Sequence, residues 1–125
     1  TQTEGSVIIS QGDPVLLNCT YQISGAPVPF WYVQYPNAVL RLFLRDIGRV
    51  NSDEGIRKGF NATHEKKSQS FHLWKPSSDL SDSATYYCAV SDTVRGRAGE
   101  YVSVLFLCKV ALNLLNLYGA VTFLL

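Results

Sequence analysis

The 125-residue chain is long enough to bury one hydrophobic core, and 46% of its residues are hydrophobic. A formal net charge of +1 gives no electrostatic footprint for nucleic acid or for a strongly acidic partner. The sequence has no glycine-rich phosphate loop, no metal-ligand spacing and no fixed nucleophile beside a histidine. We therefore expect no enzyme, no cofactor and no metal, and we expect His64 and His72 at the surface.

The chain opens with two short stretches that favour β-structure. Residues 6–10 are β-branched, as in a short edge strand, and residues 11–14 carry a turn signal. Residues 15–21 alternate in hydrophobicity, and Cys19 identifies the face that is buried. The residues expected to point inward are Val15, Leu17, Cys19 and Tyr21.

A loop and a strand follow. Residues 23–29 are rich in small residues and proline and predict a loop, and residues 30–35 predict the next strand. If Trp31 faces the core, the two-residue period of a strand also turns Val33 inward. Tyr32 and Gln34 then point outward.

The middle of the chain predicts three more strands. They cover residues 40–44, 59–63 and 70–75, and the polar segment 46–55 is expected to form a second loop. Parity places Phe60, Ala62, Phe71 and Leu73 inside, and Asn61, His72 and Trp74 outside. The outward Trp74 is either a contact residue or a ring that lies along neighbouring side chains.

The segment around Cys88 identifies the fold. Cys19 lies far upstream, Trp31 follows it, and Tyr86 precedes Cys88 by two positions. This combination is typical of an immunoglobulin-type sandwich, in which a disulfide joins the two sheets and the indole packs against it. A disulfide requires an oxidising compartment, hence a secreted or cell-surface protein. By parity Tyr87 points outward and shares a face with Tyr32 and Gln34.

Four runs of sequence carry a closer resemblance. They are residues 30–36 (FWYVQYP), 58–63 (KGFNAT), 70–73 (SFHL) and 82–90 (DSATYYCAV). They resemble the variable domain of a T-cell receptor alpha chain, over residues 1–92. The resemblance implies an all-β, V-type immunoglobulin sandwich of two antiparallel sheets. It also implies a receptor subunit at the outer face of the plasma membrane, anchored through parts absent from this chain.

The resemblance implies partners and the residues that meet them. The partners are a T-cell receptor beta chain and a peptide bound to a major histocompatibility molecule. The beta-chain contact would be formed by Tyr32, Gln34, Leu40 and Tyr87. The antigen-binding loops would comprise Ile23, Ser24, Gly25, Ala26, Pro27 and Val28; Asp46, Ile47, Gly48, Arg49, Val50, Asn51, Ser52 and Asp53; and Ser91 and Asp92.

A second reading remains open. The chain could instead be an unpaired immunoglobulin-like module of a cell-surface adhesion or co-receptor protein. Such a module usually carries charge where this sequence has Tyr32, Gln34 and Tyr87. Two tyrosines and a glutamine resemble the core of an interface more than a wetted surface, which favours the receptor domain.

Two features depart from the family. Gly59 stands where the family usually has an arginine that pairs with the aspartate at position 82. We expect Arg57 or Lys58 to take the place of that arginine. Such an ion pair would contribute little to stability if it formed near the surface. The joining motif Phe-Gly-x-Gly-Thr, whose glycines allow a bulge in the last strand, is absent after Cys88.

Residues 93–125 are therefore expected to form an atypical hydrophobic tail. Codons GAC, ACA and GTG at Asp92, Thr93 and Val94 would read the recombination heptamer CACAGTG in frame, as in an unrearranged variable gene translated into noncoding DNA. Alternatively residues 101–107 form a strand beside that of Cys88, with Cys108 a free thiol. A membrane span is a poor third reading, because the uncharged run is shorter than about 20 residues.

Two sequons complete the sequence features. Asn61-Ala62-Thr63 lies at an outward strand position, which suits N-glycosylation in a secreted protein. Asn18-Cys19-Thr20 also matches, but its middle residue is expected in the disulfide. Asn18 is therefore the weaker candidate.

Overall fold

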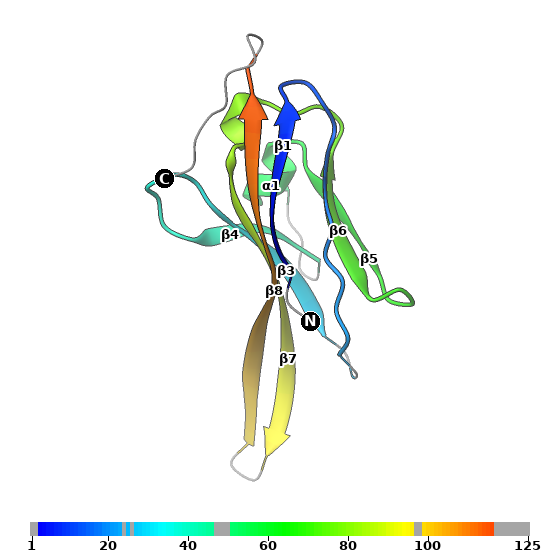
Figure 1. The fold of residues 1–125 in the computed structure, drawn as a ribbon. Helices are drawn as coiled ribbons and strands as arrows, with labels where there is room; N and C mark the ends of the chain where they lie inside the picture. The colour runs from blue at the N-terminus through cyan, green and yellow to red at the C-terminus, as the bar shows by residue number, and fades with distance from the viewer. Residues whose placement is uncertain (1–2, 24, 26, 47–50, 97–98, 117–125) are drawn as a thin grey trace.

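The computed structural model describes residues 3–23, 25, 27–46, 51–96 and 99–116. Its strands form two sheets, so the expected all-β sandwich is confirmed (Figure 1). The larger sheet is not antiparallel throughout, because its first and last strands in the chain pair in parallel. One sheet has five strands in the order β1 (Thr3–Ser10), β8 (Gly99–Leu115), β7 (Ala84–Gly96), β3 (Val28–Gln34) and β4 (Arg41–Arg45). The other has three, in the order β2 (Val15–Leu17), β6 (Ser70–Lys75) and β5 (Asn61–Glu65).

The predicted disulfide joins the two sheets. Cys19 follows β2, Cys88 lies in β7, and their Cα atoms are 6.3 Å apart. Beside the bridge, Trp31 is fully buried and its Nε1 donates a hydrogen bond of 2.8 Å to the carbonyl oxygen of Phe71 in the opposite sheet. The indole therefore fills the core without leaving its N–H unpaired.

The tyrosine corner is also formed. The hydroxyl of Tyr86 donates a 2.7 Å hydrogen bond to the carbonyl oxygen of Asp82, at the end of a short 3-10 helix, η1 (Leu80–Asp82). Phe43 packs edge-on against Tyr86 and against Phe60, with ring centroids 5.4 Å and 5.0 Å apart. The side chains predicted to face inward are buried: Val15, Leu17, Cys19, Tyr21, Val33, Phe60, Ala62, Phe71 and Leu73.

A one-turn helix, α1 (Glu54–Arg57), was not predicted and begins where the second loop was expected to continue. Four residues are too few to show a helical hydrophobic period, so the sequence pattern does not reveal it. Gly55 lies so close to β4 that a Cβ atom there would stand 2.9 Å from the carbonyl oxygen of Phe43. The glycine thus allows α1 to pack directly on the strand backbone.

The last strand, β8, is an inner strand of the five-stranded sheet. It pairs antiparallel with β7 and parallel with β1, and it buries Cys108, Val110, Leu112 and Leu114 in the core. The expected boundary at residue 92 does not coincide with a structural boundary, because β7 continues to Gly96. In Figure 1 the β7–β8 hairpin extends past the rest of the sandwich.

β8 contains the bulge for which the family uses glycine. Cys88 pairs with Cys108, but the next residue, Ala89, pairs with Phe106, so that Leu107 has no partner in the register. A residue without a partner is the mark of a β-bulge. The strand thus forms a bulge without the glycines of the missing motif.

Candidate functional site

The outer face of the five-stranded sheet carries the side chains that the sequence assigned to a partner. Tyr32 on β3 pairs in register with Tyr87 on β7 and with Leu42 on β4. All three side chains are partly exposed, whereas Trp31 and Val33, the neighbours of Tyr32 along β3, are fully buried. The strand period has therefore separated a core face from an aromatic outer face, as parity predicted.

Gln34 extends this face toward the β3–β4 turn. Its Nε2 donates to the carbonyl oxygen of Ala38 at 3.1 Å, and its Oε1 accepts from the Tyr87 hydroxyl at 3.4 Å. These contacts fix the amide at the surface. Next to it, Val39 is 77% exposed and Leu40 41% exposed, so two apolar side chains border the face.

Lys109 also belongs to this face, although no motif in the sequence indicated it. It pairs in register with Tyr87, is exposed, and places its Nζ 5.9 Å from the centre of the Tyr87 ring. An alignment of Phe106 to Lys109 with the missing Phe-Gly-x-Gly would have placed a lysine where the motif has its second glycine. The outer face therefore carries one positive charge beside its aromatic rings.

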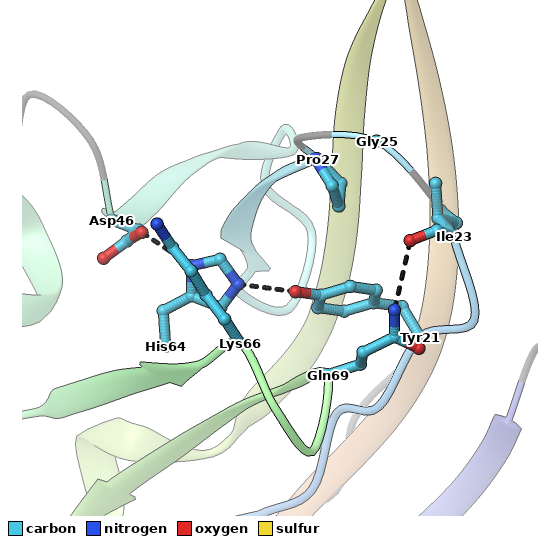
Figure 2. A pocket seen from close by; sticks show the side chains of 8 residues that line it. All are labelled: Tyr21, Ile23, Gly25, Pro27, Asp46, His64, Lys66 and Gln69. Carbon is cyan, nitrogen blue, oxygen red and sulfur yellow. Dashed lines mark hydrogen bonds and ion pairs between the residues drawn. The ribbon is translucent and has the colours of Figure 1, made fainter.

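The predicted first and second loops meet at a cavity of about 250 Å³, shown in Figure 2. Asp46, at the start of the second loop, faces the first-loop residues across it. Gln69 holds the first loop in place, because its Nε2 donates to the carbonyl oxygen of Ile23 at 3.2 Å. The residues that line the cavity are Tyr21, Ile23, Gly25, Pro27, Asp46, His64, Lys66 and Gln69.

His64 links the two loops, and its expected surface position is wrong. Its side chain is only 7% exposed. Nδ1 lies 2.9 Å from Asp46 Oδ2 and Nε2 lies 2.6 Å from the Tyr21 hydroxyl (Figure 2). Burial, together with the negative charge of Asp46, raises the pKa of Tyr21. The two-residue period of β5 that buries Ala62 also turns His64 inward, where it meets Asp46 and Tyr21.

His72 is also bound within the chain. Its Nδ1 accepts a 2.9 Å hydrogen bond from the backbone N–H of Cys19. Both histidines are thus used by the scaffold. Within the described part of the chain, no group of three or more histidine, cysteine, aspartate or glutamate side chains is placed to hold a metal ion.

The second loop divides into a buried and an exposed part. Asp53 is 7% exposed and accepts hydrogen bonds of 2.8 Å and 3.2 Å from the Arg45 guanidinium, so its carboxylate faces β4. Asn51 and Ser52 are exposed. The remaining predicted loop residues Ser24, Ala26, Ile47, Gly48, Arg49 and Val50 lie outside the described residues.

The residues expected to begin the third loop lie within a strand. Ser91 pairs with Val28 of β3 and with Val104 of β8, and Asp92 pairs with Ser103. Val28, expected at the end of the first loop, is accordingly the first residue of β3. These pairings place the end of the first loop beside the base of the β7–β8 hairpin.

Both sequons lie on the outer side of the three-stranded sheet. Asn61 begins β5, and its Oδ1 accepts a 2.9 Å hydrogen bond from the N–H of Ala62. Asn18 is exposed just after β2, and its carbonyl oxygen accepts a 3.4 Å contact from the thiol of Cys108. Cys108 is free and buried, and burial raises the pKa of its thiol. Neither α1 nor η1, in the part of the chain described, has the length and apolar character needed to cross a membrane.

Comparison with known proteins agrees with this architecture. Residues 2–107 match the model of the immunoglobulin V-set domain. The T-cell receptor alpha chain V region CTL-F3 of Mus musculus is 50% identical over 92 residues, which are 74% of this chain and 68% of that protein. The T cell receptor alpha variable 9-2 and alpha variable 3 proteins of Homo sapiens are each 48% identical over 91 residues, 73% of this chain and 80% and 79% of theirs.

Proposed function

Because the chain belongs to the T-cell receptor alpha variable regions, within the immunoglobulin V-set family, we propose that it forms the alpha half of an antigen-recognition unit. Its partners would be a T-cell receptor beta chain and a peptide bound to a major histocompatibility molecule, at the outer face of the plasma membrane. Variable domains of this family are extracellular parts of membrane receptors and are not enzymes. The observation that carries the proposal is the aromatic outer face of the five-stranded sheet.

The composition of that face supports pairing. Tyr32 and Tyr87 lie side by side on neighbouring strands, with Gln34 hydrogen-bonded to Tyr87 and Leu40 at the border. Tyrosine is enriched at the centre of protein interfaces, because it combines a large apolar area with a polar tip. A beta chain that covers this face would bury both rings.

The loop end supports recognition. The disulfide and the Trp31 hydrogen bond join the two sheets, and loops held on such a scaffold are suited to binding. His64 ties Asp46 to Tyr21 just before the first loop, so the first and second loops share one anchor. The β7–β8 hairpin stands beside them and would make the third contact.

One observation favours the alternative of an unpaired adhesion or co-receptor module. Lys109 places an exposed charge on the outer face, and charged residues are depleted at interface cores. The two proposals differ in whether this face assembles with a beta chain.

Co-expression with a beta chain in a secretory cell line, followed by co-purification, separates these proposals. Gln34→Glu should weaken assembly, because a carboxylate replaces an amide that would otherwise donate to the partner. Gln22→Glu is the matched control, since Gln22 is an exposed glutamine away from this face. Equal assembly of both variants with wild type would argue against the pairing face, and no assembly of any of them would favour the unpaired module.

For residues 93–125 we propose translation from noncoding DNA after an unrearranged variable gene. Residues 93–96 and 99–115 of this segment belong to β7 and β8, so a random apolar stretch would have filled the place of the joining segment. The DNA sequence tests this directly. Any codons for Asp92, Thr93 and Val94 that do not spell the heptamer would end the proposal.

A further inference from the structure

The outer face of the three-stranded sheet carries an exposed apolar pair. Leu16 on β2 and Trp74 on β6 are register partners, and they are 60% and 41% exposed. Side chains that stand directly opposite on antiparallel strands have Cβ atoms only about 4.5–5.5 Å apart. The two side chains therefore form one continuous apolar surface, on the side of the molecule opposite Tyr32 and Tyr87.

A sequon lies in the same row. Trp74 is also the register partner of Asn61 on the other neighbouring strand, β5. The row thus runs Leu16, Trp74, Asn61 across all three strands, with the asparagine side chain directly beside the indole. Thr63, the third residue of the sequon, is exposed two positions along the same face.

We propose that Asn61 carries an N-linked glycan whose first N-acetylglucosamine lies on the indole of Trp74, with Leu16 extending the apolar platform. The apolar C–H face of a pyranose ring is complementary to an aromatic face. The glycan comes from a lipid-linked oligosaccharide. A bond forms between Asn61 Nδ2 and C1 of the sugar as the bond from C1 to the lipid pyrophosphate breaks, and the amide loses one proton.

This occupant accounts for an exposed tryptophan better than a protein partner does, because the sugar is attached beside the ring. The transfer takes place on the unfolded chain, so the hydrogen bond from Ala62 N–H to Asn61 Oδ1 in the folded domain does not oppose it. The inference rests on passage through the secretory pathway, which the disulfide requires. It does not depend on pairing with a beta chain.

Asn18 provides an internal comparison. It is exposed on the same side of the sheet, two residues after Leu16, but it has no register partner among the strands. Its sequon contains Cys19, which is bridged to Cys88. A glycan at this position would lack the direct cross-strand neighbour that Trp74 gives to Asn61.

The experiment uses the full chain secreted alone from a mammalian cell line. Intact mass and glycopeptide mapping should find Asn61 occupied, and Thr63→Ala should abolish this occupancy without altering Asn61. Thr20→Ala is the matched control, because it removes the other sequon at another exposed threonine. An unoccupied Asn61 in wild type would overturn the proposal.

Acrylamide quenching then tests the stacking. Trp31 is fully buried, so quenching reports on Trp74, the second of the chain's two tryptophans. Wild type trimmed enzymatically to one sugar should be quenched less steeply than Thr63→Ala. The same trimmed protein should melt at a higher temperature than Thr63→Ala, and this difference should disappear when both carry Trp74→Ala.

Two outcomes would overturn the stacking while leaving the beta-chain proposal intact. The first is equal quenching of trimmed wild type and Thr63→Ala. The second is a glycan-dependent gain in melting temperature that persists in Trp74→Ala. If Trp74 is protected from acrylamide equally in Thr63→Ala and in Thr20→Ala, a second protein or a second copy of the chain covers Leu16 and Trp74 instead.

Discussion

Lys58 forms an ion pair with Asp82, with Nζ 3.0 Å from Oδ1. Lys75 binds the other oxygen at 2.8 Å, and the carboxylate is fully buried. Of the two residues expected to replace the family's arginine, Lys58 therefore forms the pair, whereas Arg57 donates to the carbonyl oxygen of Ser52. The pair does not lie near the surface, because Asp82 has no exposed area, and it has two cationic partners.

Asp82→Asn should therefore destabilise the domain by about 3–5 kcal/mol, the usual cost of breaking a buried ion pair by removing one partner. Lys58 would lose its acidic partner, and the buried Lys75 would keep only the exposed Asp79, 3.3 Å away. Urea denaturation of the disulfide-intact domain measures the change. Glu65→Gln is the control, because Glu65 is an exposed carboxylate, and it should cost under about 1 kcal/mol. Similar losses in both variants would show that the burial of Asp82 has no energetic consequence.

Lys109→Ala should strengthen assembly with a beta chain. Covering the outer face removes water from this ammonium group, and the aromatic ring of Tyr87 only partly replaces that water. We expect a gain of about 1.4 kcal/mol, which is about tenfold in Kd. Titration of a purified beta variable domain measures it, with Lys67→Ala as the control at an exposed lysine of another surface. Weaker assembly of Lys109→Ala would mean that the partner binds the charge.

The domain should lose stability in alkaline solution. Burial and the hydrogen bond with Glu54 raise the pKa of Tyr35, and burial with the nearby Asp82 charge raises that of Tyr86. Where the folded-state pKa of a tyrosine is raised, its contribution to the free energy of unfolding is fully present below the unfolded-state pKa of about 10. That contribution is lost as the pH rises toward the folded-state pKa. The free energy of unfolding should therefore fall above about pH 10. Urea denaturation at a series of pH values from about 8 upward measures it.

Tyr35→Phe separates the contribution of Tyr35. The Tyr35 hydroxyl donates to Glu54 at 2.6 Å, so the variant should be less stable at neutral pH and should lose stability less steeply in alkali. An alkaline slope equal to that of wild type would contradict the assignment.

Leu112→Ala should destabilise the domain by about 2–5 kcal/mol, because its side chain is fully buried in the core and leaves a cavity. This variant tests whether the atypical last strand is packed in solution. The control is Asn113→Ala, a partly exposed neighbour in the same strand, which should change stability by less than about 0.5 kcal/mol. If Leu112→Ala unfolds at the same urea concentration as wild type, β8 contributes no packing.

The sequence by itself determined which side chains face inward on β2, β3, β5 and β6. A strand has a period of two, and one landmark such as Cys19 or Trp31 fixes the face for its whole strand. It also determined the disulfide and the tyrosine corner, because the spacing of these residues is specific to the fold. The outward Tyr32, Gln34 and Tyr87 followed from the same parity.

Only the tertiary structure decided the partners of polar groups from distant segments. Asp82 binds Lys58 and Lys75, and His64 joins Asp46 to Tyr21, because sheet pairing brings these positions together. The register of β8 was likewise set by pairing with other strands: with β7 from Gly99 to Leu112, where the bulge at Leu107 lies, and with β1 from Cys108 to Leu115. Local patterns specify the face of a strand, whereas contacts between segments depend on the packing of the whole chain.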